Sequence, residues 1–206
     1  MTPPARRAVL LGGTFDPLHV GHLVVARQVR LALAADEVWL IPAGDPPHRR
    51  TAAAAADRLA MVVAVADVDP GLRVLDLEVR RLGPSYTSDT LDALARAHPD
   101  VEQWFVLGAD AAREIRGWHA LGHLFETANF VLVNREGVPE MTRLEALGLG
   151  FDPTRTRLVR VDSPPVSATD IRRRAAAGEA LDGLVPPPVA ACIAARSLYR
   201  EQGAVG

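Results

Sequence analysis

Short apolar runs alternate with longer amphipathic stretches along most of the chain, and this pattern predicts strands alternating with helices. Uninterrupted apolar runs are typical of strands buried on both faces, whereas strict alternation indicates a half-buried strand. The runs lie at residues 8–11, 37–41, 104–107, 130–133 and 157–161, and 72–79 alternates. The order predicts an α/β fold: a Rossmann-like, doubly wound, mainly parallel sheet with helices on both faces.

The stretches between the strands carry helical periodicity. Residues 18–35 place Val20, Leu23, Val24, Val29, Leu31 and Leu33 in an apolar stripe, and the alanine-rich stretch 51–68 offers Leu59, Met61, Val62, Val63 and Val65 to the core. Further helices are expected near 87–98, within 111–125, at 141–149, from 163 to 178, and at 186–202. Without a long linker, we expect a single domain, 1–206, with a C-terminal helical portion (about 163–206) packed on it.

Composition narrows the class of protein. The 206 residues carry a net charge of −2, which provides no electrostatic footprint for nucleic acid or an anionic membrane. No apolar run reaches the roughly 18 residues of a membrane span, and we expect a cytoplasmic protein. The single cysteine, Cys192, excludes an internal disulfide and is expected to be a core thiol. The complete lack of lysine excludes Schiff-base chemistry and a P-loop lysine.

The stretch 12–22, GGTFDPLHVGH, follows the first strand and leads into a helix. Its two glycines allow a phosphate to approach the backbone, and His19 and His22 fall one helical turn apart. Imidazoles at a helix start can donate hydrogen bonds to a reacting phosphate. An isolated His-x-x-His is more often a surface or capping pair, but the glycines and Thr14 favour the functional interpretation. Neither Cys192 nor His48 has a spacing that indicates zinc.

Polar residues and glycines follow several predicted strands. Gly12, Pro42, Gly108 and Arg135 each stand just past an apolar run, and strand ends of a parallel sheet meet at one crevice. We therefore expect these segments to converge. Ser167 and Thr169 begin a later helix and Arg172 follows one turn on, a combination that could bind an anion or could be a plain N-cap with a solvated basic face.

With these motifs in place, the chain resembles the nicotinate-nucleotide adenylyltransferase family of bacteria, within the nucleotidyltransferase superfamily that has the T/H-x-G-H signature. Similar landmarks follow in the family's order as IPAGDPPH, PSYTSDTL, VLGAD, Trp118, VSATDIR and a terminal LYR. The resemblance spans nearly the whole chain. Three features depart from the family pattern: VSAT stands for the commoner ISST, Arg49 replaces a frequent lysine, and the turn at 134–137 is short.

The resemblance implies a set of site residues. The catalytic residues would be His19, His22 and Arg172. The residues implied for ATP are Gly12, Gly13, Thr14, Phe15, His22, Gly108, Asp110, Ser167, Thr169 and Arg172, and those implied for the nicotinate nucleotide are His48, Tyr86, Thr87, Trp118 and Arg135. Taken alone, Asp110 could equally be a helix cap and Trp118 a core side chain. No residue is expected to be a metal ligand, because Mg²⁺ would enter with ATP, held by phosphate oxygens and water.

The implied activity is adenylyl transfer from ATP to nicotinate mononucleotide, giving nicotinate adenine dinucleotide and pyrophosphate in NAD biosynthesis. The alternatives are a related transferase that uses nicotinamide mononucleotide or pantetheine phosphate, a cytidylyltransferase, or a non-catalytic nucleotide-binding module. A class I aminoacyl-tRNA synthetase shares the look of the histidine motif, but the chain has no lysine for that family's second signature. The expected partners are ATP and nicotinate mononucleotide, with a homo-oligomer left open.

Overall fold

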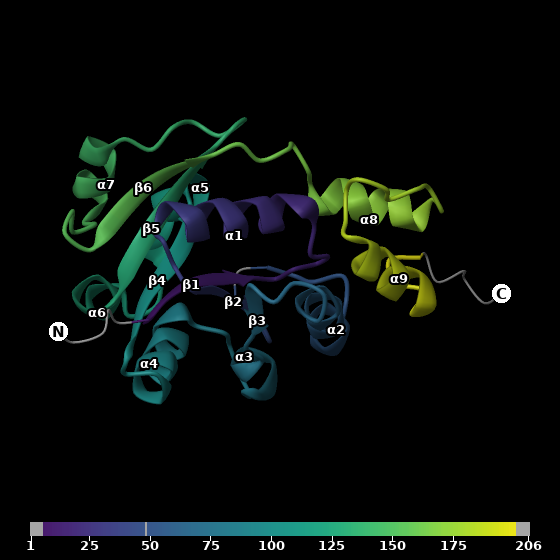
Figure 1. The fold of residues 1–206 in the computed structure, drawn as a ribbon, viewed down its shortest axis with the longest axis horizontal. Coiled ribbons are helices and arrows are strands. Elements are labelled where there is room, and N and C mark those ends of the chain that lie inside the picture. The colour runs from purple at the N-terminus through teal and green to yellow at the C-terminus, as the bar shows by residue number, and fades with distance from the viewer. Residues whose placement is uncertain (1–5, 48, 201–206) are drawn as a thin grey trace.

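The computed structural model describes residues 6–47 and 49–200, in which six strands form one parallel sheet (Figure 1). The strands are β1 (Arg6–Gly13), β2 (Glu37–Pro42), β3 (Leu72–Val74), β4 (Val101–Gly108), β5 (Asn129–Arg135) and β6 (Thr156–Val161). Their order is β3-β2-β1-β4-β5-β6, and all neighbouring pairs are parallel. The predicted Rossmann-like fold is confirmed, and its topological switch point lies between β1 and β4.

Helices cover both faces of the sheet, and each face has its own apolar core. The first core packs against α1 (Val20–Ala32), α2 (Ala55–Ala66), α8 (Ala168–Ala176) and α9 (Pro187–Ala195). The second packs against α4 (Thr87–Ala97), α5 (Ala109–Arg113), α6 (Leu121–Thr127) and α7 (Arg143–Leu149). Strand β1 supplies Val9 and Leu11 to the first core and Ala8 and Leu10 to the second, as its pleat requires. In Figure 1, α1 and α4 accordingly lie on opposite sides of β1.

The C-terminal helices contribute to the first core. Ile171 of α8 and Val189 and Ile193 of α9 share the cluster that contains Val9 of β1. Helix α9 also packs on α2, and the Val20 amide at the start of α1 donates a 3.0 Å hydrogen bond to the Leu184 carbonyl. The segment that joins α8 to α9 is thereby held at the first turn of α1.

Two predicted elements differ from the structure. The strand predicted over 72–79 ends at Val74 and is followed by the short helix α3 (Leu77–Arg80). There the carboxylate of Glu78 turns inward, 8% exposed, and accepts a 2.7 Å hydrogen bond from the Thr90 hydroxyl. The helix predicted over 186–202 ends at Ala195, because the backbone turns left-handed at Ser197 (φ 50°) and Tyr199 (φ 63°).

Three predicted core positions are also wrong or only partly right. Leu31 is 79% exposed on α1, and Val63 is exposed on α2, whose inner face instead buries Arg58 completely. Cys192 is half-buried against the first core rather than inside it. Within the described residues, no helix has the length and apolar character needed to cross a membrane.

Candidate active site

The two histidines of the first motif stand at the start of α1, just past the carboxyl end of β1. His19 is the N-cap residue, in extended backbone conformation, and its ring stacks on that of His22 with centroids 3.7 Å apart. The His19 amide donates a 3.3 Å hydrogen bond to Nδ1 of His22. Because Nδ1 accepts there, the proton of the neutral His22 ring is assigned to Nε2, which remains a donor.

Both rings are held neutral at physiological pH. Burial, followed by the nearby Arg135 cation, lowers the pKa of His19 to about 4. The pKa of His22 lies well below its usual range because of burial first, then His19 and Arg135. The pair therefore offers hydrogen-bond donors without fixed positive charge. A bound polyanion would raise both pKa values by favouring the protonated rings.

The two glycines at the end of β1 leave room beside aromatic rings. A β-carbon at Gly12 would come within 3.2 Å of the Phe105 ring, and one at Gly13 within 3.2 Å of the Phe15 ring. Phe15 has a positive φ of 48°, is 1% exposed, and meets the His22 ring edge-on. Its side chain belongs to the core, so only its backbone can face a nucleotide.

Strand β4 and strand β5 bring a carboxylate and a cation to the same edge. Gly108 ends β4, and Asp110 follows in the first turn of α5. The Asp110 carboxylate pairs with the Arg135 guanidinium at 3.2 Å, and both side chains are exposed. Arg135 thus pairs with Asp110 and lies close enough to the two histidines to lower their pKa values.

The late motif faces the first motif directly. Ser167 is the N-cap of α8, and among the described residues its side chain makes no capping hydrogen bond. The Arg172 guanidinium donates to the Asp16 carbonyl at 2.7 Å and to the Thr169 hydroxyl at 3.2 Å. Residues more than 150 positions apart are thereby joined across the switch point, with exposed hydroxyls at a helix start beside them.

The residues predicted for the nicotinate ring gather near β4. Tyr86 precedes α4, which begins at Thr87, and the Tyr86 ring stacks on His119 with centroids 4.3 Å apart. Trp118 meets the Phe105 ring edge-on at 6.4 Å. A β-carbon at Gly12 would also contact the Phe105 ring. Trp118 therefore lies on the face of the sheet that carries the second core.

The proline-rich loop after β2 is held against the same region. The Ser85 hydroxyl accepts hydrogen bonds from the amides of Gly44 (3.0 Å) and Asp45 (3.2 Å). This loop therefore borders the segment that leads into Tyr86. His48, which was also predicted for the nicotinate nucleotide, lies outside the described residues.

One buried cation that the sequence interpretation overlooked organises the loops. Arg58 of α2 donates to the carbonyls of Thr14 (2.7 Å), Gly44 (2.9 Å) and Ala53 (3.3 Å). Burial lowers its pKa, and Asp16 opposes that shift. The helical periodicity could have predicted that Arg58 is buried, because this residue falls on the same face of α2 as the buried residues Met61, Val62 and Val65.

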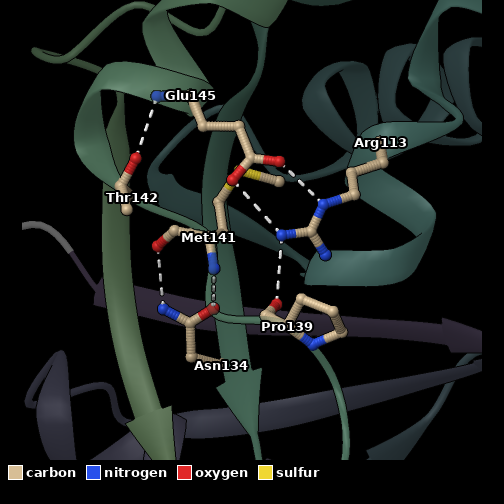
Figure 2. Close-up of polar contacts among 6 residues, drawn as sticks. All are labelled: Arg113, Asn134, Pro139, Met141, Thr142 and Glu145. Carbon is tan, nitrogen blue, oxygen red and sulfur yellow. Dashed lines mark hydrogen bonds and ion pairs between the residues drawn. The ribbon is translucent and has the colours of Figure 1, made fainter.

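The segment after Arg135 is anchored by the contacts in Figure 2. The Asn134 amide donates to the Met141 carbonyl at 3.0 Å and accepts from the Met141 amide at 2.8 Å. Arg113 binds the Glu145 carboxylate at 2.7 and 3.2 Å and the Pro139 carbonyl at 3.0 Å, and the Thr142 hydroxyl caps α7. These bonds fix the end of β5 from which Arg135 projects.

Comparison with known proteins connects this geometry to a family. Residues 10–174 match the family model described as cytidylyltransferase-like. A probable nicotinate-nucleotide adenylyltransferase of Clavibacter michiganensis is 38% identical, over 98% of this chain and 99% of the relative. One from Symbiobacterium thermophilum is 41% identical, over 94% of this chain and 95% of the relative.

A solved structure resembles this fold over almost the whole chain. The Plasmodium falciparum nicotinic acid mononucleotide adenylyltransferase complexed with NaAD superposes with a TM-score of 0.77. The alignment covers 94% of this chain and 97% of that chain, at 19% sequence identity. At that identity the likeness supports the fold alone.

Proposed function

The chain belongs to the nicotinate-nucleotide adenylyltransferase family, and on that premise we propose that it transfers the adenylyl group of ATP to nicotinate mononucleotide, in NAD biosynthesis. The observation that carries the proposal is the contact of Arg172 with the Asp16 carbonyl. It brings together the two motifs that bear hydroxyl, guanidinium and imidazole donors, all of which suit phosphate oxygens. We also propose that the activity takes place in the cytoplasm, where ATP is supplied.

The proposed reaction is an in-line displacement. An oxygen of the 5′-phosphate of nicotinate mononucleotide forms a bond to the α-phosphorus of ATP. The bond from that phosphorus to the oxygen that bridges the β-phosphate breaks, and pyrophosphate leaves with the electron pair. Because the nucleophile is already an anion at neutral pH, the enzyme needs no covalent intermediate and acts by positioning and charge stabilisation.

The ATP side of the site is assigned from the donors present. His19 and the Nε2–H of His22 would donate to the reacting phosphates, and Gly12 and Gly13 let them approach the strand end. Arg172, with Ser167 and Thr169 at the start of α8, would hold the β- and γ-phosphates. Further ATP contacts are proposed through the backbone of Thr14 and Phe15 and, at the ribose, through Gly108 and Asp110.

The acceptor side is assigned to the aromatic cluster. Trp118 would stack on the nicotinate ring beside Tyr86, the N-cap of α4, and Thr87, the first residue of that helix, would present its amide to the carboxylate of the ring. Arg135 would meet the acceptor phosphate where it approaches the histidines, consistent with its position beside Asp110. His48 is proposed from the sequence alone.

Mg²⁺ is proposed as the cofactor that arrives with ATP. In the described part of the chain, no group of three or more histidine, cysteine or acidic side chains could hold a metal ion. The carboxylate of Asp16 is occupied by protein donors, and Asp110 is paired with Arg135. The available donors therefore fit an ion held mainly by ATP oxygens and water, where it would neutralise phosphate charge.

We further propose that residues 1–206 act as one nucleotidyltransferase domain, since α8 supplies half of the ATP site. The test of the function is to incubate the purified chain with ATP, nicotinate mononucleotide and Mg²⁺ and to identify products by mass spectrometry. Nicotinate adenine dinucleotide and pyrophosphate should form in equal amounts. A folded protein that binds ATP but releases no pyrophosphate would instead be a non-catalytic nucleotide-binding module.

A further inference from the structure

The carboxylate of Asp16 is buried inside the first motif, where it receives three hydrogen bonds. It is 5% exposed and accepts from the amides of Ala52 (2.6 Å) and Ala53 (3.1 Å). The third donor is the hydroxyl of Tyr199, at 2.8 Å, from the far end of the chain. The backbone carbonyl of the same aspartate receives the Arg172 guanidinium. Asp16 therefore links the Tyr199 hydroxyl to the side chain proposed to hold ATP.

Tyr199 reaches Asp16 through an unusual backbone path. Beyond the end of α9, the chain adopts left-handed conformations at Ser197 and Tyr199, which residues with a side chain rarely adopt. Burial raises the pKa of the Tyr199 phenol, and the hydrogen bond to Asp16 raises it further. The hydroxyl thus keeps its proton and remains a donor to the carboxylate.

We propose that Tyr199 is a positioning residue for ATP: its hydroxyl orients Asp16, whose carbonyl in turn holds the Arg172 guanidinium toward the polyphosphate. The proposal rests on the proposed role of Arg172. Tyr199 itself touches neither substrate. Its removal should therefore weaken ATP binding and leave the acceptor side, around Trp118, unaffected.

The C-terminal segment has a second tether that does not involve the site. The Arg196 guanidinium pairs with the Asp57 carboxylate of α2 at 2.7 Å, near the protein surface. Like Tyr199, Arg196 joins the segment after α9 to another part of the fold, but it contacts neither Asp16 nor Arg172. Arg196→Gln is therefore a matched control that loosens the same segment without touching the proposed link.

The experiment measures binding of a non-hydrolysable ATP analogue by calorimetry in a double-mutant cycle. Tyr199→Phe should weaken binding about 5-fold, within the range for residues that act through a packed network. Arg196→Gln should leave the affinity unchanged. In an Arg172→Ala background, Tyr199→Phe should cause no further loss, because the side chain it positions is missing.

Equal losses for Tyr199→Phe and Arg196→Gln, or a Tyr199→Phe loss that persists in the Arg172→Ala background, would overturn the proposal. If Tyr199→Phe does not fold, Asp16→Asn replaces it, because this variant keeps the size of the side chain and weakens its acceptor; the same loss is expected. In steady-state assays, KM for ATP should rise with KM for nicotinate mononucleotide unchanged. The binding arm needs no acceptor, so it tests the Tyr199 link even if the proposed reaction fails.

Discussion

The His19 amide donates to Nδ1 of His22 while the two rings stack, which leaves the Nε2–H of His22 as a donor at the switch point. Replacing His22 with alanine should reduce turnover by about 10²- to 10³-fold, the usual cost of losing one donor to a developing charge. The melting temperature should change by only a few degrees. His123→Ala, which removes an exposed imidazole paired with Asp92, is the control. Near-normal turnover of His22→Ala would show that His22 is not a catalytic residue.

The depressed pKa of His19 makes stability fall in acid. Above pH 6.5 the ring is neutral in both the folded and the unfolded chain, and its contribution is fully present. As the pH falls below 6.5, His19 becomes protonated in the unfolded chain, whereas in the folded chain it stays neutral until the pH approaches about 4. At pH 5 this difference amounts to about 2 kcal/mol.

Chemical denaturation at pH 7.5 and pH 5 measures this effect. The wild type should lose about 2 kcal/mol more unfolding free energy over that interval than His19→Asn, which cannot titrate. The comparison cancels the contribution of groups common to both proteins. The same pH dependence in the two proteins would show that His19 is not held neutral by the fold.

The Arg58 side chain is the buried connection between the loops of the site. Arg58→Met should lower the unfolding free energy by about 3 kcal/mol, because the carbonyls of Thr14 and Gly44 would lose a charged donor. Arg96→Met, on the exposed part of α4, should change it by less than about 0.5 kcal/mol. Similar small losses for both variants in urea unfolding would contradict the assigned role.

The Asn134 amide anchors the turn after Arg135 (Figure 2). Asn134→Ala removes both bonds to the Met141 backbone and should cost about 2 kcal/mol of stability. Glu145→Gln, which removes the charge of the half-exposed pair with Arg113, should cost clearly less, because solvent partly screens that interaction. Urea unfolding of both variants measures the two losses of unfolding free energy. A larger loss for Glu145→Gln than for Asn134→Ala would contradict the anchoring role of Asn134.

The sheet was predictable because its strands are continuous apolar runs, so burial and chain order alone indicate a parallel sheet with helices on both faces. The interpretation failed where a tertiary contact decides. Glu78 lies in an alternating stretch that predicts a strand, yet it is part of the short helix α3, where its buried carboxylate accepts a hydrogen bond from Thr90. Leu31 falls in the predicted apolar stripe of α1 but is 79% exposed, because the helix buries a narrower face that contains Leu23, Ala26 and Val29.

The candidate site was predictable as a convergence of strand ends but not as a network. The structure brings Arg172 to the first motif and Arg135 to Asp110. The hydrogen bond from Tyr199 to Asp16 could not be predicted, because the two residues are far apart in the sequence and their contact depends on how α9 packs on α2. No local pattern indicates that the hydroxyl of a residue near the C-terminus donates to an aspartate in the first motif.

The central claim is the choice of acceptor, and parallel measurement of kcat/KM tests it most directly. Pyrophosphate release is followed with ATP and, separately, nicotinate mononucleotide, nicotinamide mononucleotide and phosphopantetheine. We predict the highest kcat/KM for nicotinate mononucleotide, because the amides in the first turn of α4, from Thr87 onward, favour a carboxylate over an amide. A higher kcat/KM for either of the other acceptors would contradict the account.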